Sequence, residues 1–140
     1  MSKLNGLKCI LLVDDDEITN MIHKRIIEST DPDLHVQTVS AGQEALDYLL
    51  GRHKDPFIKP GIIFLDINMP GMNGWEFLER YHELSDEYKV KAVVVMLTTS
   101  VDPEDRVKAA ENPDIKKFVN KTLTRENLEE IIEHHFGSES

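Results

Sequence analysis

The stretches Ile62-Ile63-Phe64-Leu65 and Val93-Val94-Val95-Met96-Leu97 carry an apolar side chain at every position. A strand that is apolar throughout is typical of a parallel sheet, because helices cover both of its faces. Short apolar or β-branched stretches bounded by polar or turn residues predict three further strands. The five expected strands are Lys8–Val13, Leu34–Val39, Gly61–Leu65, Ala92–Leu97 and Ile115–Val119.

Between these strands, apolar residues recur at the spacing of a helix that buries one side. The residues expected to face the core are Ile18, Met21, Ile22 and Ile26 in the first helix, Ala45, Leu46 and Leu49 in the second, Phe77, Leu78, Tyr81 and Leu84 in the third, and Leu128, Ile131, Ile132 and His135 in the last. Pro103–Glu111 is weakly apolar, so its helix should be the least firmly packed. Ser40 and Gln43 have the spacing of a capping box at the start of the second helix. Strict alternation of strand and helix predicts a three-layer α/β/α sandwich with right-handed crossovers.

The chain has the size and composition of one soluble domain. Its 140 residues are 40% hydrophobic and 30% charged, which suits a single domain of residues 1–140 with a core at about residues 8–136. A formal net charge of -10 repels nucleic acids and anionic membrane surfaces. The sequence has no apolar run of membrane-spanning length, no signal-peptide core and only one cysteine. We therefore expect a cytoplasmic protein that binds neither nucleic acid nor membrane.

Polar residues follow the expected strands, and in parallel sheets the functional site lies beyond the carboxyl ends of the strands. These residues are Asp14, Asp15, Asp16 and Glu17 after the first strand, Asp66 and Asn68 after the third, Thr98 and Thr99 after the fourth, and Asn120 and Lys121 after the fifth. Clustered carboxylates favour a hard cation such as Mg²⁺. A carboxylate beside Mg²⁺ and a lysine is a candidate phosphoryl acceptor, because neutralisation of charge dominates that chemistry.

Two blocks of sequence give these positions a family resemblance. Leu11-Leu12-Val13-Asp14-Asp15-Asp16 and Asp66-Ile67-Asn68-Met69-Pro70-Gly71-Met72-Asn73-Gly74, followed in order by Thr98 and Lys121, resemble the receiver domain of two-component response regulators. The resemblance extends over roughly Lys8 to Phe136. It implies a flavodoxin-like (CheY-like) fold, in which the five parallel strands lie in the order 2-1-3-4-5.

The resemblance also implies a role for each of seven residues. Asp66 matches the phosphoacceptor, Asp15 a direct Mg²⁺ ligand, Asp14 a ligand acting through water, Asn68 the donor of a backbone carbonyl to the metal, Thr98 the switch hydroxyl, Lys121 the phosphate-binding lysine and Phe118 the switch aromatic. The phosphoryl group would come from a histidine kinase or a histidine phosphotransfer protein. A downstream protein would bind the face formed by Pro103–Glu111, Ile115–Val119 and Arg125–His135.

Two features depart from the family pattern. The family usually has a proline after the lysine, joined by a cis peptide, whereas Thr122 stands here. A cis bond without proline costs about 2.5–4 kcal/mol, so a trans peptide and a loop of different shape are the alternative, and the sequence leaves the choice between cis and trans open. The second departure is the loop Gly51–Pro60, which is longer than usual for the family.

Only four residues follow Phe136, so we expect a stand-alone receiver that signals through another protein and is not an enzyme, beyond phosphorylating and dephosphorylating itself. The main enzyme alternative is a Mg²⁺-dependent phosphatase resembling the haloacid dehalogenase-like family, but that family needs an aspartate where Asn68 stands. A flavodoxin-like cofactor binder is excluded because the acidic residues after the first strand would repel a flavin phosphate. A receiver fold that only binds other proteins remains an alternative.

Structural roles are expected for Asp16, Glu17 and the six histidines. Asp16 and Glu17 are expected to cap the first helix and complement its dipole. The six histidines share no metal-ligand spacing with the cysteine, so we expect them to be surface groups.

Overall fold

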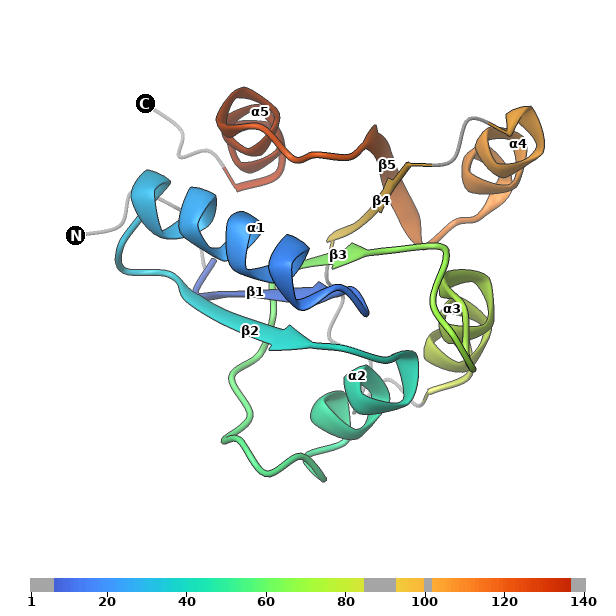
Figure 1. Cartoon of the computed structure of the whole chain (residues 1–140), viewed down its shortest axis with the longest axis horizontal. Coiled ribbons are helices and arrows are strands. Elements are labelled where there is room, and N and C mark those ends of the chain that lie inside the picture. The colour runs from blue at the N-terminus through green and yellow to red at the C-terminus, as the bar shows by residue number, and fades with distance from the viewer. Residues whose placement is uncertain (1–6, 85–92, 100–101, 137–140) are drawn as a thin grey trace.

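The computed structural model describes residues 7–84, 93–99 and 102–136, in which strands and helices alternate (Figure 1). The elements in chain order are β1 (Cys9–Val13), α1 (Glu17–Thr30), β2 (His35–Val39), α2 (Gly42–Leu49), β3 (Ile62–Leu65), α3 (Gly74–Glu83), β4 (Val93–Thr98), α4 (Pro103–Glu111), β5 (Ile115–Asn120) and α5 (Arg125–Phe136). All ten lie where the sequence predicted them, to within a few residues at their ends. Ala92, the first residue of the predicted fourth strand, lies outside the described residues.

The five strands form one parallel sheet in the order β2-β1-β3-β4-β5, which confirms the predicted topology. Val13, the last residue of β1, lies between Val39 of β2 and Leu65 of β3. Leu65 in turn lies beside Met96 of β4. Because the strands are parallel, the residues that follow them emerge at one edge of the sheet.

Helices cover both faces of the sheet. Every residue of β1 is buried, and alternate side chains enter two separate apolar cores. Ile10 and Leu12 pack on the side of α1 and α5, whereas Leu11 and Val13 pack on the side of α2 and α3. Burial of one such side chain contributes about 1.5–3 kcal/mol, which explains why β1 and β3 contain only apolar residues.

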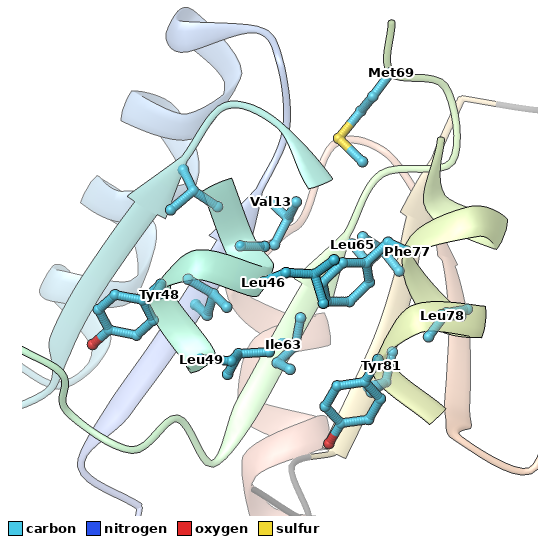
Figure 2. Close-up of a cluster of buried hydrophobic side chains, with 14 of the residues drawn as sticks. Val13, Leu46, Tyr48, Leu49, Ile63, Leu65, Met69, Phe77, Leu78 and Tyr81 are labelled. Atoms are coloured by element: carbon cyan, nitrogen blue, oxygen red, sulfur yellow. The ribbon is translucent and has the colours of Figure 1, made fainter. Parts of the chain in front are cut away.

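The core beneath α2 and α3 is built across β3 (Figure 2). Leu46 of α2 and Phe77 of α3 meet over Leu65, which follows from the apolar face predicted for each helix. The rings of Phe77 and Tyr81 stack with their centroids 6.0 Å apart. α4 is less firmly packed, because Ala109 is its only buried residue, as its weakly apolar sequence predicted.

The prediction of which side α1 buries was wrong for three of its four residues, since only Ile26 packs against the core. Ile18, Met21 and Ile22 are 64%, 46% and 45% exposed. The buried residues of α1 are instead Asn20, His23 and Ile27, so His23 is not the surface group expected from the sequence. The helix turns this side inward because main-chain polar groups at the end of the sheet need hydrogen-bond partners, and an apolar side chain could not supply them.

Of the two helix caps predicted from the sequence for α1 and α2, one is confirmed and the other is absent. α2 begins after Ala41, which makes no side-chain cap, so the capping box predicted from Ser40 to Gln43 is absent. The carboxylate of Glu44 instead accepts hydrogen bonds from the main-chain N–H and the hydroxyl of Ser40, at 2.8 and 3.1 Å. Asp16 caps α1 as predicted, since its side chain accepts from the N–H groups of Ile18 and Thr19.

The long loop of residues 51–60 runs along the outer edge of the sheet. The side-chain amide of Gln37 in β2 donates to Asp55 at 2.9 Å. The Tyr48 hydroxyl both donates to the carbonyl and accepts from the N–H of Ile58, at 2.9 and 2.8 Å. His53 contacts the Glu44 carboxylate at 2.8 Å, and its side chain is only 7% exposed, contrary to the expectation of a surface histidine. Throughout the part of the chain described, no helix is long and apolar enough to cross a membrane.

Candidate functional site

Asp14 and Asp66 are placed next to each other by the main chain of the sheet. The N–H of Asp14 donates to the carbonyl of Val39 at 3.2 Å, and that of Asp66 to the carbonyl of Val13 at 3.0 Å. These bonds extend the parallel ladders by one residue beyond β1 and β3. Both carboxylates are nearly enclosed, with exposed fractions of 4% for Asp14 and 5% for Asp66.

Asp15 completes a cluster of three carboxylates. Oxygens of Asp14, Asp15 and Asp66 lie within 4.8 Å of one another, and Asp15 is the exposed member. The Asp14 side chain also accepts from the N–H of Asp16 at 2.9 Å, which holds the start of α1 close to the cluster. The carboxylate of Asp16 is used in the helix cap instead.

Lys121 brings the positive charge of this site. Its ammonium nitrogen lies 2.6 Å from Oδ2 of Asp14 and 3.3 Å from Oδ1 of Asp66, and its side chain is 13% exposed. The N–H of Lys121 donates to the carbonyl of Thr98 at 2.8 Å, so the end of β4 holds the start of the loop. The Lys121–Thr122 peptide is cis, a point that the sequence alone left open.

The start of α3 packs directly on the backbone of Asp66. A Cβ atom added to Gly74 would lie 2.6 Å from the Asp66 carbonyl oxygen, so only glycine fits here. The N–H of Gly74 donates to the carbonyl of Ile67 at 2.8 Å. Asn73 and Glu76 form a capping box that fixes the first turn of α3. The Met-Asn-Gly end of the motif thus holds the chain after Asp66.

The remaining predicted site residues are Thr98, Phe118 and Asn68. Thr98 was predicted to follow the fourth strand, but it is the last residue of β4 and is fully buried, whereas Thr99 is exposed. Phe118 is partly buried against the core of α2 and α3, with the Arg106 guanidinium 5.0 Å from its ring centroid. The side chain of Asn68 is exposed, and its N–H donates to the Asp66 carboxylate at 3.4 Å.

Burial and crowding of like charges shift the pKa values at this site. Burial, together with the nearby charge of Asp14, raises the pKa of Asp66, and the Lys121 ammonium opposes this only in part. For Lys121, burial alone would lower the pKa, but the hydrogen bond to Asp14 and the two carboxylate charges outweigh burial and raise it. Lys121 therefore stays protonated at neutral pH.

The donor set fits a hard divalent cation. Three carboxylates face one ammonium, so the cluster retains net negative charge, and all three offer oxygen ligands of the type that Mg²⁺ prefers. Asp14 and Asp66 are too buried for water to screen their repulsion fully, and a cation would relieve it.

Two polar residues of α1 contact this region and were not identified from the sequence. The Asn20 side-chain amide donates to the carbonyls of Asp14 and Val39, at 2.9 and 3.3 Å. His23 accepts a hydrogen bond at Nε2 from the N–H of Leu123, at 3.3 Å. Asn20, His23 and Ile27 recur at the spacing of one helix face, and this was the available signal.

Comparison with known proteins gives a consistent result. The family described as "Response regulator receiver domain" matches residues 10–133. A two-component response regulator structure from Cytophaga hutchinsonii has 34% sequence identity and a TM-score of 0.79, over 89% of this chain and 93% of that one. A response regulator receiver protein from Dyadobacter fermentans has 28% identity and a TM-score of 0.79, over 94% of this chain and 99% of that one.

Similarity to curated proteins extends to both short and very long relatives. A two-component response regulator of Arabidopsis thaliana is 28% identical over 92% of this chain and 84% of its own length. A hybrid signal transduction histidine kinase of Dictyostelium discoideum is 29% identical over 96% of this chain, which spans only 7% of that protein. The chain belongs to the response regulator receiver domain family, and its fold is the CheY-like flavodoxin fold.

The raised pKa of Asp66 predicts that Asp66→Asn increases stability at neutral pH. A carboxyl whose pKa is raised in the folded state favours folding only while it is protonated, below its unfolded pKa of about 3.9. That contribution is lost as the pH rises through the raised folded value. Urea unfolding of metal-free protein should therefore show the variant to be more stable at pH 7, with the difference shrinking towards pH 4.

Glu28→Gln, at an exposed position of α1, controls for the loss of one negative charge. An Asp66→Asn protein that is less stable than the wild type at pH 7 would show that the Lys121 pairing outweighs burial and repulsion.

Proposed function

We propose that this chain acts in the cytoplasm as a single receiver domain over residues 1–140. Asp66 accepts a phosphoryl group from a histidine kinase or a histidine phosphotransfer protein in a reaction that depends on Mg²⁺. A conformational switch then passes the signal to a partner protein. The observation that carries this proposal is the position of Asp66, a buried carboxylate directly after β3 with the Lys121 ammonium 3.3 Å away.

The geometry supports transfer to Asp66 because the groups that compensate charge lie beside the nucleophile. A carboxylate oxygen of Asp66 would attack phosphorus as the bond to the donor's imidazole nitrogen breaks, and an acyl phosphate would form. Lys121 already binds both Asp14 and Asp66, so its ammonium can contact phosphoryl oxygens with little movement. Asp14, Asp15, Asp66 and the backbone carbonyl of Asn68 would hold Mg²⁺, which supplies further neutralisation of phosphoryl charge.

The same geometry favours a signalling domain over a phosphatase. An aspartyl phosphatase needs a general acid two residues after the nucleophile, and Asn68 occupies that position with an amide that does not titrate. We therefore propose that the chain is not an enzyme, apart from its own phosphorylation and dephosphorylation. An interaction domain without phosphoryl chemistry is the competing proposal.

We propose that the signal leaves through the face formed by α4, β5 and α5. A groove of about 380 Å³ runs between α4 and β5, and Phe118 and Arg106 line it. α4 buries only Ala109, so a small free-energy difference can shift its packing. Thr98, at the buried end of β4, would move towards a phosphoryl group on Asp66, and Phe118 would fill the space it leaves.

Phosphorylation is expected on Asp66 alone. Incubation with Mg²⁺ and acetyl phosphate should add one phosphoryl group, stable in acid and labile in base, and peptide mass spectrometry should place it on Asp66. Asp66→Asn removes the attacking oxyanion and should abolish the adduct while circular dichroism stays unchanged. An adduct on another residue would contradict the assignment, and the lack of any adduct would favour the interaction domain.

Mg²⁺ should stabilise the protein by mass action, since it would bind the folded cluster and not the unfolded chain. Asp15→Ala removes an exposed member of the cluster and should weaken Mg²⁺ binding about tenfold or more. Asp16→Ala is the matched control, because the Asp16 carboxylate is used as a helix cap. Thermal unfolding against Mg²⁺ concentration gives both affinities, and equal losses in the two variants would show that the metal lies elsewhere.

Thr98→Ala should permit phosphorylation at Asp66 but weaken the change at the distant face. With beryllofluoride as the phosphoryl mimic, hydrogen exchange in α4 should change in the wild type and much less in Thr98→Ala. Thr99→Ala, at the exposed neighbouring position, is the control. Unchanged protection of α4 in a wild-type protein whose Asp66 is demonstrably occupied would contradict the proposed switch.

A further inference from the structure

α1 buries two polar side chains that none of the proposed chemistry uses. His23 is 1% exposed, and its Nε2 accepts a hydrogen bond from the N–H of Leu123 at 3.3 Å. Asn20 is 5% exposed, and its amide binds the carbonyls of Asp14 and Val39. A histidine turned into the protein on a helix that exposes Ile18 and Met21 needs a physical explanation.

The hydrogen bond to His23 anchors the loop that carries Lys121. At the start of the loop, the N–H of Lys121 donates to the carbonyl of Thr98 at 2.8 Å. Two residues later, the N–H of Leu123 donates to His23, and the Leu123 side chain is buried in the core beneath α1 and α5. The loop is therefore attached to β4 on one side of Thr122 and to α1 on the other.

This bond requires the neutral form of His23. Because Nε2 accepts from a main-chain N–H, the proton of the ring is assigned to Nδ1. Burial lowers the pKa of His23, the Asp14 charge opposes that shift and the Lys121 charge adds to it. The ring is thus mostly neutral at pH 7 and keeps the lone pair that Leu123 needs.

We propose that His23 is a positioning residue for Lys121. By accepting the Leu123 N–H, it fixes residues 121–123 so that the ammonium of Lys121 meets the carboxylates of Asp14 and Asp66. Asn20, one turn earlier on the same helix, holds the main chain of Asp14. One helix thereby sets the position of both partners in the 2.6 Å contact between Lys121 and Asp14. The catalytic consequence rests on the proposed phosphorylation of Asp66, whereas the positioning itself does not.

The test compares a variant that loses the acceptor with one that keeps it. His23→Leu removes the acceptor and retains an apolar side chain of similar volume, so it leaves the N–H of Leu123 buried without a partner. His23→Gln places an amide oxygen near the position of Nε2 and should restore the bond. Ile27→Val is the matched control. Ile27 is fully buried on the same face of α1, and its side chain has no hydrogen-bonding group that could hold the loop.

Two measurements are made on each protein. In metal-free protein, NMR follows amide exchange of Leu123 and the side-chain signals of Lys121, which report the pairing with Asp14. With Mg²⁺ and acetyl phosphate, intact mass gives the rate at which the phosphoryl adduct forms. We expect His23→Leu to shift the Lys121 signals and slow phosphorylation by up to about 100-fold, the cost of a misplacement of about 1 Å. His23→Gln should recover most of both, and Ile27→Val should change neither.

Unchanged Lys121 signals in His23→Leu would overturn the proposal, as would equal effects of His23→Leu and His23→Gln, which would assign the role to packing of the ring. If His23→Leu does not fold, His23→Gln is compared with the wild type alone. Shifted Lys121 signals in a His23→Gln protein whose Leu123 amide is still protected from exchange would then overturn the proposal. If the wild type forms no adduct, the proposed function fails, and the NMR measurement still decides whether His23 positions Lys121.

Discussion

The contact of one ammonium with two buried carboxylates is the constraint on which the rest of this structure depends. Lys121 lies 2.6 Å from Asp14 and 3.3 Å from Asp66, and all three side chains are largely removed from water. Burial of such charges is costly, so an arrangement of this kind contributes little net stability. The arrangement instead fixes the orientation of the three side chains, because each is held where its partners compensate its charge.

Three main-chain hydrogen bonds and one close backbone packing hold this contact in place. Parallel ladders carry Asp14 and Asp66 one residue past β1 and β3, and the carbonyl of Thr98 holds Lys121 at the end of β4. α3 closes on the Asp66 backbone through Gly74, where no larger residue fits. The strands and α3 that position these residues are firmly packed in the core. α4 buries a single residue and is the element best suited to move.

α1 shows why buried polar groups are harder to predict than apolar ones. Its apolar residues recur at helical spacing, and that pattern correctly predicted a helix. It failed to predict the buried side, because Ile18 and Met21 face solvent while Asn20 and His23 face inward. Periodicity records which residues share a face. It does not record that main-chain groups at the end of a sheet need partners from that face.

The sequence by itself determined the order of the elements, the parallel sheet and the presence of carboxylates, a hydroxyl and a lysine near the ends of its strands, because apolar runs and helical spacing are local properties. Only the tertiary structure decided that Thr98 ends β4 inside the core, that the Lys121–Thr122 peptide is cis and that His23 contacts Leu123. The contact between His23 and Leu123 joins residues that are 100 positions apart in the chain, and the burial of Thr98 likewise depends on the surrounding fold. Their packing and hydrogen bonding exist only once the sheet and both helical layers have assembled.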